Sequence, residues 1–264
     1  MAIGILIIGD EILSGRREDK HLAKSIELLG ARGMRLSWAR LCGDDQPMLI
    51  QTLRECFATG DVFFSFGGIG ATPDDHTRQA VAAARGVELA LHPEAEAEIR
   101  ARFGAETTPG RLEMGRLPAD ARIVPNPYNR IPGFAVGQAA AGQGSIGQAT
   151  AGQAYFLPGF PVMAWPMMEW ALDTELAHLH HADDHAEASV WVFDAQESQL
   201  TPLMHALQDE FGVVIFSLPS TLVPGGRRQI ELGAKGPRAS VDVAMTALRE
   251  GVAALGFTVE EIRG

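Results

Sequence analysis

Residues 62–77 read VFFSFGGIGATPDDHT, a short apolar run followed by a glycine-rich turn and an acidic helix start. The apolar run over 62–66 predicts a strand buried on both faces, because continuous apolar residues are typical of strands covered by helices on both sides. The glycines predict a tight turn, and residues 74–85 predict a helix. This strand–turn–helix unit is the kind from which open α/β sheets are built.

The same alternation continues on both sides of this unit. The predicted strands lie at 2–8, 34–41, 122–124 and 155–157, and the predicted helices at 19–33, 46–59, 93–103 and from 161 to about 179. Alternating strands and helices favour a doubly wound, mostly parallel sheet with right-handed crossovers. We therefore expect residues 1–180 to form one α/β domain.

Within that domain, residues 137–153 have a different composition. Gly-Gln pairs recur every five residues from Gly137 to Gln153, and small residues fill most of the gaps. Such a segment has little apolar surface to bury, so we predict a flexible surface insertion of low complexity. A functional tether is the alternative.

A second pattern begins after the polar run HLHHADDH at 178–185. Residues 186–264 predict strands at 188–193, 213–218, 227–234 and 257–262, with helices at 199–211 and 239–255. The order β-α-β-β-α-β is that of a small ferredoxin-like α+β domain. This fold is shared by many unrelated proteins and predicts no function by itself.

The charge and the cysteines restrict the classes of partner. The 264-residue chain carries a formal net charge of −11, which repels nucleic acid and anionic membranes. No stretch approaches the length of a membrane span. Cys42 and Cys56 are too few for a disulfide framework and favour reduced thiols in a cytoplasmic protein. We expect a small-molecule ligand, with neither nucleic acid nor membrane as partner.

The glycine turn predicts an anion-binding site. Without side chains, Gly67, Gly68 and Gly70 let backbone N–H groups approach a ligand closely. The start of the following helix adds a positive partial charge. Together these features are typical of a phosphate cradle.

Acidic residues follow three of the predicted strands: Asp10 and Glu11, then Asp44, then Asp75. The carboxyl ends of parallel strands meet at one edge of a sheet, where ligands bind. Carboxylates beside a phosphate repel it unless a cation lies between them, and Mg²⁺ binds through one or two carboxylates plus substrate phosphates. We therefore predict a divalent-metal site at these four acids, although helix capping is an alternative role for such residues.

Several stretches together resemble the molybdopterin-binding domain of molybdenum-cofactor biosynthesis proteins, and most closely the competence/damage-inducible protein A branch. The stretches are IGDEILSG at 8–15, GDD at 43–45, GGIGATPDDHT at 67–77, Asn126-Pro127, PGF at 132–134 and LPGFP at 157–161. The similarity runs in order through about two-thirds of the chain. Larger residues stand at 128–130 than in many relatives, and these are expected to fill or reshape the ligand pocket.

The resemblance implies site residues. It makes Asp44 and Asp75 the functional pair, and it implies a phosphate- or pterin-binding set of Gly67, Gly68, Ile69, Gly70, Thr72, Thr77, Pro132 and Gly133. It also implies a homo-oligomer, a dimer or trimer. The amidohydrolase domain that often follows in that branch is expected to be absent.

The resemblance further implies a function. One reading is a nucleotide pyrophosphatase acting on an ADP-ribose-like substrate with Mg²⁺, Mn²⁺ or Co²⁺. A second is a non-hydrolytic molybdopterin-binding protein of molybdenum-cofactor biosynthesis. A third is a degenerate relative that serves as an assembly partner.

Overall fold

A computed structural model describes residues 2–137, 152–181, 184–220 and 227–262. The chain divides into two compact units, Met1–Ala182 and Asp183–Gly264. Most of the predicted Gly-Gln insertion, residues 138–151, lies outside the described residues.

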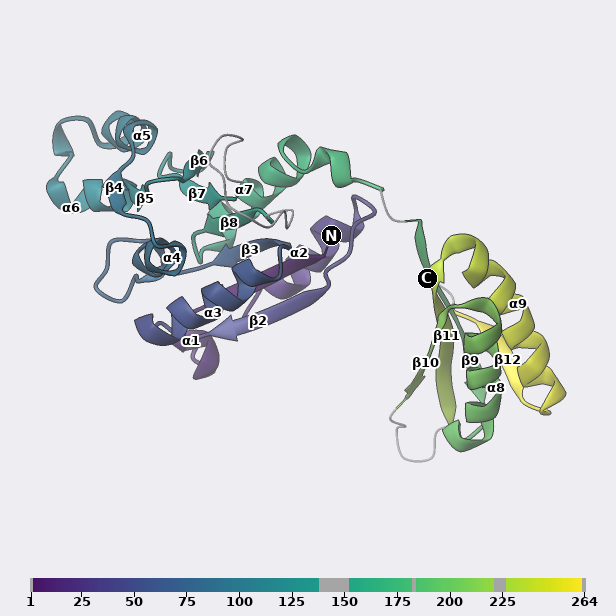
Figure 1. The fold of residues 1–264 in the computed structure, drawn as a ribbon. Helices are drawn as coiled ribbons and strands as arrows, with labels where there is room; N and C mark the ends of the chain where they lie inside the picture. The colour runs from purple at the N-terminus through teal and green to yellow at the C-terminus, as the bar shows by residue number, and fades with distance from the viewer. Residues whose placement is uncertain (1, 138–151, 182–183, 221–226, 263–264) are drawn as a thin grey trace. The chain divides into compact units, whose positions relative to one another are not determined.

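The first unit is built on a six-stranded sheet (Figure 1). Its strands in spatial order are β2 (Trp38–Cys42), β1 (Ile3–Ile8), β3 (Val62–Phe66), β8 (Ala154–Leu157), β7 (Gly133–Val136) and β6 (Arg122–Val124). The first four run parallel, whereas β7 and β6 are antiparallel to their neighbours. The prediction of a mostly parallel α/β fold is confirmed.

Helices cover both faces of this sheet. On one face lie α2 (His21–Gly30) and α7 (Pro161–Thr174), and on the other α3 (Gln46–Ala58) and α4 (Thr77–Arg85). Helix α5 (Pro93–Phe103) adds Ala95 to the core on the side of α3 and α4. Side chains of a strand alternate between the faces, so Phe64 packs with α7 and Phe63 with α3. This double coverage explains why β1 and β3 are apolar throughout.

Some local elements differ from the prediction. Helix α4 begins at Thr77 rather than near residue 74, because residues 72–75 close a turn in which Asp75 N–H donates to the Thr72 carbonyl at 3.0 Å. Strand β7 was not predicted. Other short elements also were not predicted: α1 (Asp10–Leu13), β4 (Leu89–Leu91), η1 (Gly104–Glu106), α6 (Pro109–Leu112), η2 (Glu113–Gly115) and β5 (Arg116–Pro118). The helix predicted from 161 to about 179 ends at Thr174, and η3 (Ala177–Leu179) follows it.

The second unit contains β9 (His185–Phe193), α8 (Glu197–Phe211), β10 (Val214–Pro219), β11 (Gln229–Pro237), α9 (Arg238–Ala254) and β12 (Thr258–Glu261). Its four-stranded sheet has the order β10-β11-β9-β12, and every neighbouring pair is antiparallel. The predicted ferredoxin-like arrangement is therefore confirmed. Apolar residues of both helices, such as Leu200 and Leu248, form its core with the sheet.

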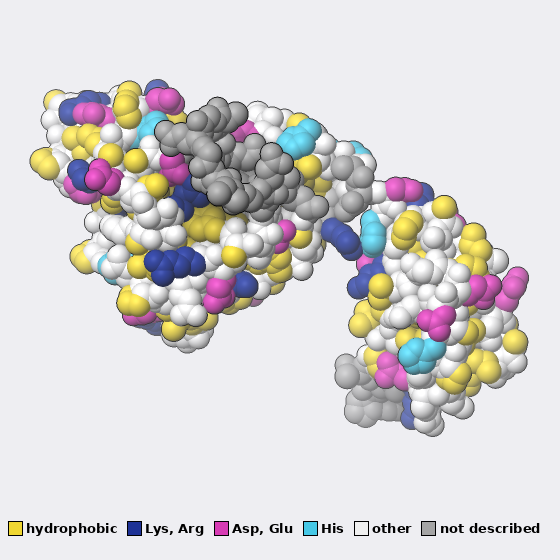
Figure 2. Space-filling model, in the orientation of Figure 1, with side chains coloured by type: hydrophobic (Ala, Val, Ile, Leu, Met, Phe, Trp, Pro, Cys, Tyr) yellow, Lys and Arg dark blue, Asp and Glu magenta, His cyan; other side chains and the backbone are white. Residues whose placement is uncertain are grey.

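Charged side chains of both signs are interspersed over the face drawn in Figure 2. Among the described helices, none combines the length and apolar character needed to cross a membrane.

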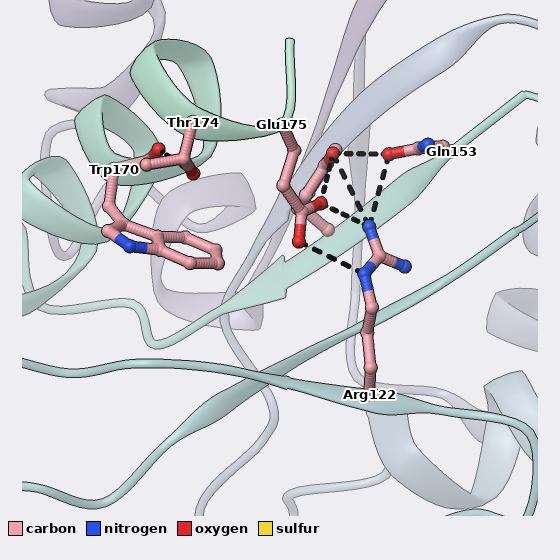
Figure 3. A network of polar contacts seen from close by, with 6 residues as sticks. Arg122, Gln153, Trp170, Thr174 and Glu175 are labelled. Carbon is pink, nitrogen blue, oxygen red and sulfur yellow. Dashed lines mark hydrogen bonds and ion pairs between the residues drawn. The ribbon is translucent and has the colours of Figure 1, made fainter.

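A polar network joins three elements of the first unit (Figure 3). Arg122 on β6 donates to the carboxylate of Glu175 just after α7, and the Tyr155 hydroxyl on β8 donates to the same carboxylate at 2.7 Å. Arg122 also donates to Gln153 Oε1 at 3.1 Å. Burial alone would raise the pKa of Glu175, but the hydrogen bonds from Arg122 and Tyr155 outweigh it and hold the pKa below its ordinary value.

We predict that Glu175→Gln destabilises the first unit at neutral pH by about 2 kcal/mol, because a partly buried ion pair loses one partner. Because the pKa of Glu175 is lower in the folded protein, its carboxylate stabilises the fold fully at a pH above the ordinary pKa of 4.5. This stabilisation is lost as the pH falls through the pKa of the folded protein. The difference from wild type should therefore shrink below pH 4. Urea unfolding followed through amide signals of β8 measures this. Glu169→Gln on the same helix is the control. If Glu175→Gln were less stable than wild type by the same amount at every pH, the role of the charge would be contradicted.

Candidate functional site

A cavity of about 510 Å³ lies at the edge of the sheet where the parallel strands end. Its walls come from the residues that follow β1, β2, β3 and β8 and from the loop between β6 and β7. Ligands of open α/β folds bind at this edge, beside the point where the strand order reverses. Here that point lies between β1 and β3, because β1 pairs with both β2 and β3.

The glycine turn packs directly against the end of β1. Gly67 has φ +109°, and a Cβ there would lie 2.3 Å from the Ile8 carbonyl oxygen. Gly68 has φ +67°, and its Cβ would lie 2.2 Å from Thr77 Oγ1. Both positions require glycine for conformation and for space. The sequence signal that predicted a tight turn thus reflects contact of β3 with both β1 and α4.

The turn leaves a run of backbone donors without partners. In the described chain, no hydrogen bond uses the N–H groups of Gly68, Ile69, Gly70 or Ala71, and all of these residues line the cavity. Thr77 fixes the turn from behind, because its Oγ1 donates to the Gly67 carbonyl at 3.1 Å and its N–H to the Gly68 carbonyl at 3.0 Å. Unpaired N–H groups at a cavity wall are a ready anion-binding surface.

Arg78 supports the same turn from the protein interior. Only 3% of the residue is exposed, and its guanidinium donates to the carbonyl oxygens of Gly70 and Glu113. Burial lowers its pKa. Arg78 therefore shapes the turn rather than reaching into the cavity.

Asp10 and Asp44 join the ends of β1 and β2. The Asp10 N–H donates to Asp44 Oδ2 at 2.8 Å, and the Asp44 N–H donates to Asp10 Oδ1 at 3.2 Å. Asp44 and Glu11 line the cavity, whereas Asp10 does not. Burial raises the pKa of Asp44, and the charges of Asp10, Glu11 and Asp74 raise it further. Negative charge is therefore concentrated at this end of the cavity.

Asp75 shapes the far end of the glycine turn. Its Oδ2 accepts hydrogen bonds from the N–H of Thr72, at 2.9 Å, and from the Thr72 hydroxyl. Asp75, Asp74 and Thr72 all line the cavity. No hydrogen bond of the described residues uses Asp75 Oδ1.

The structure separates the predicted site residues into two groups. Asp10, Thr77 and Gly133 lie behind the cavity wall, and the others line it: Glu11, Asp44, Gly67, Gly68, Ile69, Gly70, Thr72, Asp75 and Pro132. Within the described ranges, no group of three His, Cys, Asp or Glu side chains is placed to hold a metal ion. Metal binding by the predicted acids would therefore need oxygen atoms from a ligand or from water as well.

Sequence reasoning missed several wall residues, including Arg17, His21 and Met163. Arg17 and His21 follow the 8–15 stretch, and the fold returns them to the cavity because α2 begins there. Asn129 belongs to the larger residues at 128–130 that were expected at the ligand pocket, and it does line the cavity. The sequence did not indicate the direction of its side chain.

We predict that Gly67→Ala destabilises the first unit by about 3 kcal/mol, because the new Cβ meets the Ile8 carbonyl in an unfavourable backbone conformation. Gly159→Ala is the matched control on the same cavity wall. A Cβ at residue 159 would lie 3.5 Å from Gly67 Cα, which is an ordinary van der Waals distance. This substitution should therefore lower the free energy of unfolding by less than about 1 kcal/mol. Urea unfolding compares the two variants, and equal stabilities would contradict the close contact at Gly67.

Comparison with known proteins relates the first unit to a protein family. A CinA-like protein of Anaeromyxobacter sp. (strain Fw109-5) is 36% identical over 140 residues, covering 51% of this chain and 33% of the relative. One from Syntrophotalea carbinolica is 38% identical over 136 residues, covering 50% of this chain and 33% of the relative. The chain thus spans about a third of the length of these curated relatives.

A solved structure shares the architecture of the first unit. The crystal structure of the protein CinA, of unknown function, from Thermoplasma acidophilum superposes with a TM-score of 0.57 at 26% identity, covering 67% of this chain and 99% of that one. These similarities support the resemblance to the competence/damage-inducible protein A branch. Residues 4–178 match the family model described as a probable molybdopterin binding domain, and the chain therefore belongs to that family.

Proposed function

We propose that the cavity binds a phosphate-bearing ligand of the nucleotide or pterin class, with phosphate oxygens accepting from the N–H groups of Gly68 to Ala71. The observation that carries this proposal is the run of N–H donors on a cavity wall that have no partner among the described residues. Such groups need no reorganisation to receive an anion. Membership of the molybdopterin-binding-domain family supports a ligand of this class.

The charges of the wall support a phosphate held together with a cation. Arg17 is exposed, lines the cavity and forms no ion pair with the described residues, so its guanidinium is free for a phosphate. Glu11, Asp44, Asp74 and Asp75 line the same cavity and repel an anion. Binding should therefore strengthen when a divalent cation screens these acids.

The donor set fits a hard cation that keeps water and ligand oxygens. Asp44 and Asp75 each use Oδ2 to hold a backbone N–H, which leaves Oδ1 of each carboxylate for a cation or for a water molecule. Mg²⁺, Mn²⁺ or Co²⁺ bound there with the ligand's phosphates would polarise a phosphoryl oxygen. We therefore propose hydrolysis of a nucleotide pyrophosphate such as ADP-ribose as the reaction.

A second candidate is binding of molybdopterin without hydrolysis. One observation favours it: Asp10, Asp44 and Asp75 each use a carboxylate oxygen to fix the backbone, which is a sufficient reason for these acids in a purely binding site. The description of the family supports the same candidate.

We predict that the full chain hydrolyses ADP-ribose with Mg²⁺, Mn²⁺ or Co²⁺ and that Asp44→Asn lowers the rate about 100-fold. Asparagine retains an acceptor for the Asp10 N–H, so the fold is preserved while the charge is lost. Asp45→Asn is the matched control, because Asp45 caps α3 through the Met48 N–H and does not line the cavity. Product release is measured by chromatography.

A rate that falls equally in both variants would contradict a specific role for Asp44. If the folded wild type shows no turnover with any of the metals but molybdopterin raises its melting temperature, the binding candidate replaces the hydrolytic one.

A further inference from the structure

The cavity changes in character along the sheet edge. At one end lie Asp44, after β2, and Glu11, after β1. The glycine turn follows β3 in the middle, and Phe160, after β8, and Asn129, between β6 and β7, lie at the other end. A ligand with its phosphate on the glycine turn therefore has a less acidic end of the cavity for its remaining part.

His21 offers an unused acceptor in this region. The residue is 6% exposed, and its ring stacks on Phe66 with centroids 4.4 Å apart. Its Nε2 lies 3.1 Å from the Gly159 carbonyl oxygen, which can only accept, so Nε2 carries the proton and Nδ1 a lone pair. Nδ1 is buried without a partner among the described residues. Burial lowers the pKa of His21, which favours this neutral form.

Asn129 offers an underused donor. Its Oδ1 accepts from the backbone N–H of Ile131 at 3.0 Å and from Asn126 Nδ2 at 2.8 Å. Because a backbone N–H can only donate, the orientation of the amide is fixed and Nδ2 is directed to Met163 Sδ at 3.1 Å. A thioether is a weak acceptor, so this donor is poorly satisfied.

Both groups adjoin the segment from Gly159 to Met163, one through the carbonyl and the other through the sulfur atom. Buried polar groups without good partners are costly, and in a cavity a ligand can supply the missing partner.

We propose that His21 Nδ1 and Asn129 Nδ2 recognise the heterocyclic end of the ligand, accepting from a ring or amino N–H and donating to a neighbouring carbonyl or ring nitrogen. Purines and pterins present such an edge. The rings of His21 and Phe160 and the apolar side chains of Ile131 and Met163 line the same end and suit a flat ring. The inference rests on the proposed placement of the phosphate on the glycine turn.

The test compares ligands with and without the heterocycle. GMP, AMP, ribose 5-phosphate and inorganic pyrophosphate are titrated calorimetrically into wild type, His21→Phe and Asn129→Asp. His21→Phe keeps a ring to stack on Phe66 but removes both nitrogens. Asn129→Asp keeps the acceptor for Ile131 and removes the amide donor. His92→Phe is the control, because its Nδ1 is also buried without a partner but the residue does not line the cavity.

Wild type should bind GMP or AMP at least about tenfold more tightly than ribose 5-phosphate, and His21→Phe and Asn129→Asp should each remove about tenfold of that preference. The control should keep it. If the new negative charge of Asn129→Asp weakened the binding of all anions, pyrophosphate would lose as much affinity as the nucleotides. The pyrophosphate titration therefore identifies such an effect.

Purine nucleotides that bind no better than ribose 5-phosphate, or a preference unchanged in both variants, would overturn this inference while leaving phosphate binding intact. If none of the probes, pyrophosphate included, binds the folded wild type, the proposed function fails and the inference fails with it.

Discussion

The contact between Gly67 and the Ile8 carbonyl oxygen controls the geometry of the cavity. At this point the end of β3 meets the end of β1 too closely for any side chain, and Gly68 meets Thr77 in the same way. The backbone must therefore turn sharply before α4 begins. Hydrogen bonds from Thr77 and Arg78 then take up the carbonyl groups of the turn. The N–H groups of the cavity-lining residues Gly68 to Ala71 are left without partners among the described residues.

This arrangement places a surface that attracts anions beside carboxylates that repel them. The reciprocal hydrogen bonds of Asp10 and Asp44 tie β1 to β2, so these acids stabilise the backbone as well as charging the site. The raised pKa of Asp44 reflects its burial and the charge of its neighbours. Binding of a phosphate together with a cation would relieve that repulsion. The affinity for phosphate should therefore depend on the cation.

Regular periodicity made much of the fold predictable. Strand β3 and helices α3 and α5 lie within a residue of their predicted bounds, because continuous apolar runs and helical spacing are local signals. Strand β7, Gly133–Val136, was missed because it begins inside the Pro132-Gly133 pair, which is typical of a turn. The start of α4 was misplaced because Asp75 bonds to Thr72 in a turn that resembles a helix start in sequence.

The site was less predictable than the fold. The glycine turn and Asp44 could be found because they follow strands directly. His21 could not, since only the packing of α2 brings it to the cavity. For Asn129 the sequence indicated the pocket but not the direction of the side chain. The role of Arg78 also could not be predicted, because a buried guanidinium that donates to two carbonyl groups has no local sequence signature.

The central claim is that the amides of Gly68 to Ala71 bind phosphate, and amide NMR tests it most directly. Inorganic pyrophosphate with Mg²⁺ is titrated into ¹⁵N-labelled protein while the backbone signals are followed. Our account predicts saturable shifts of these four amides that exceed those of the α4 amides Ala82 to Arg85, which already donate within the helix. Binding that leaves the four amides unchanged, or shifts only residues elsewhere in the chain, would contradict it.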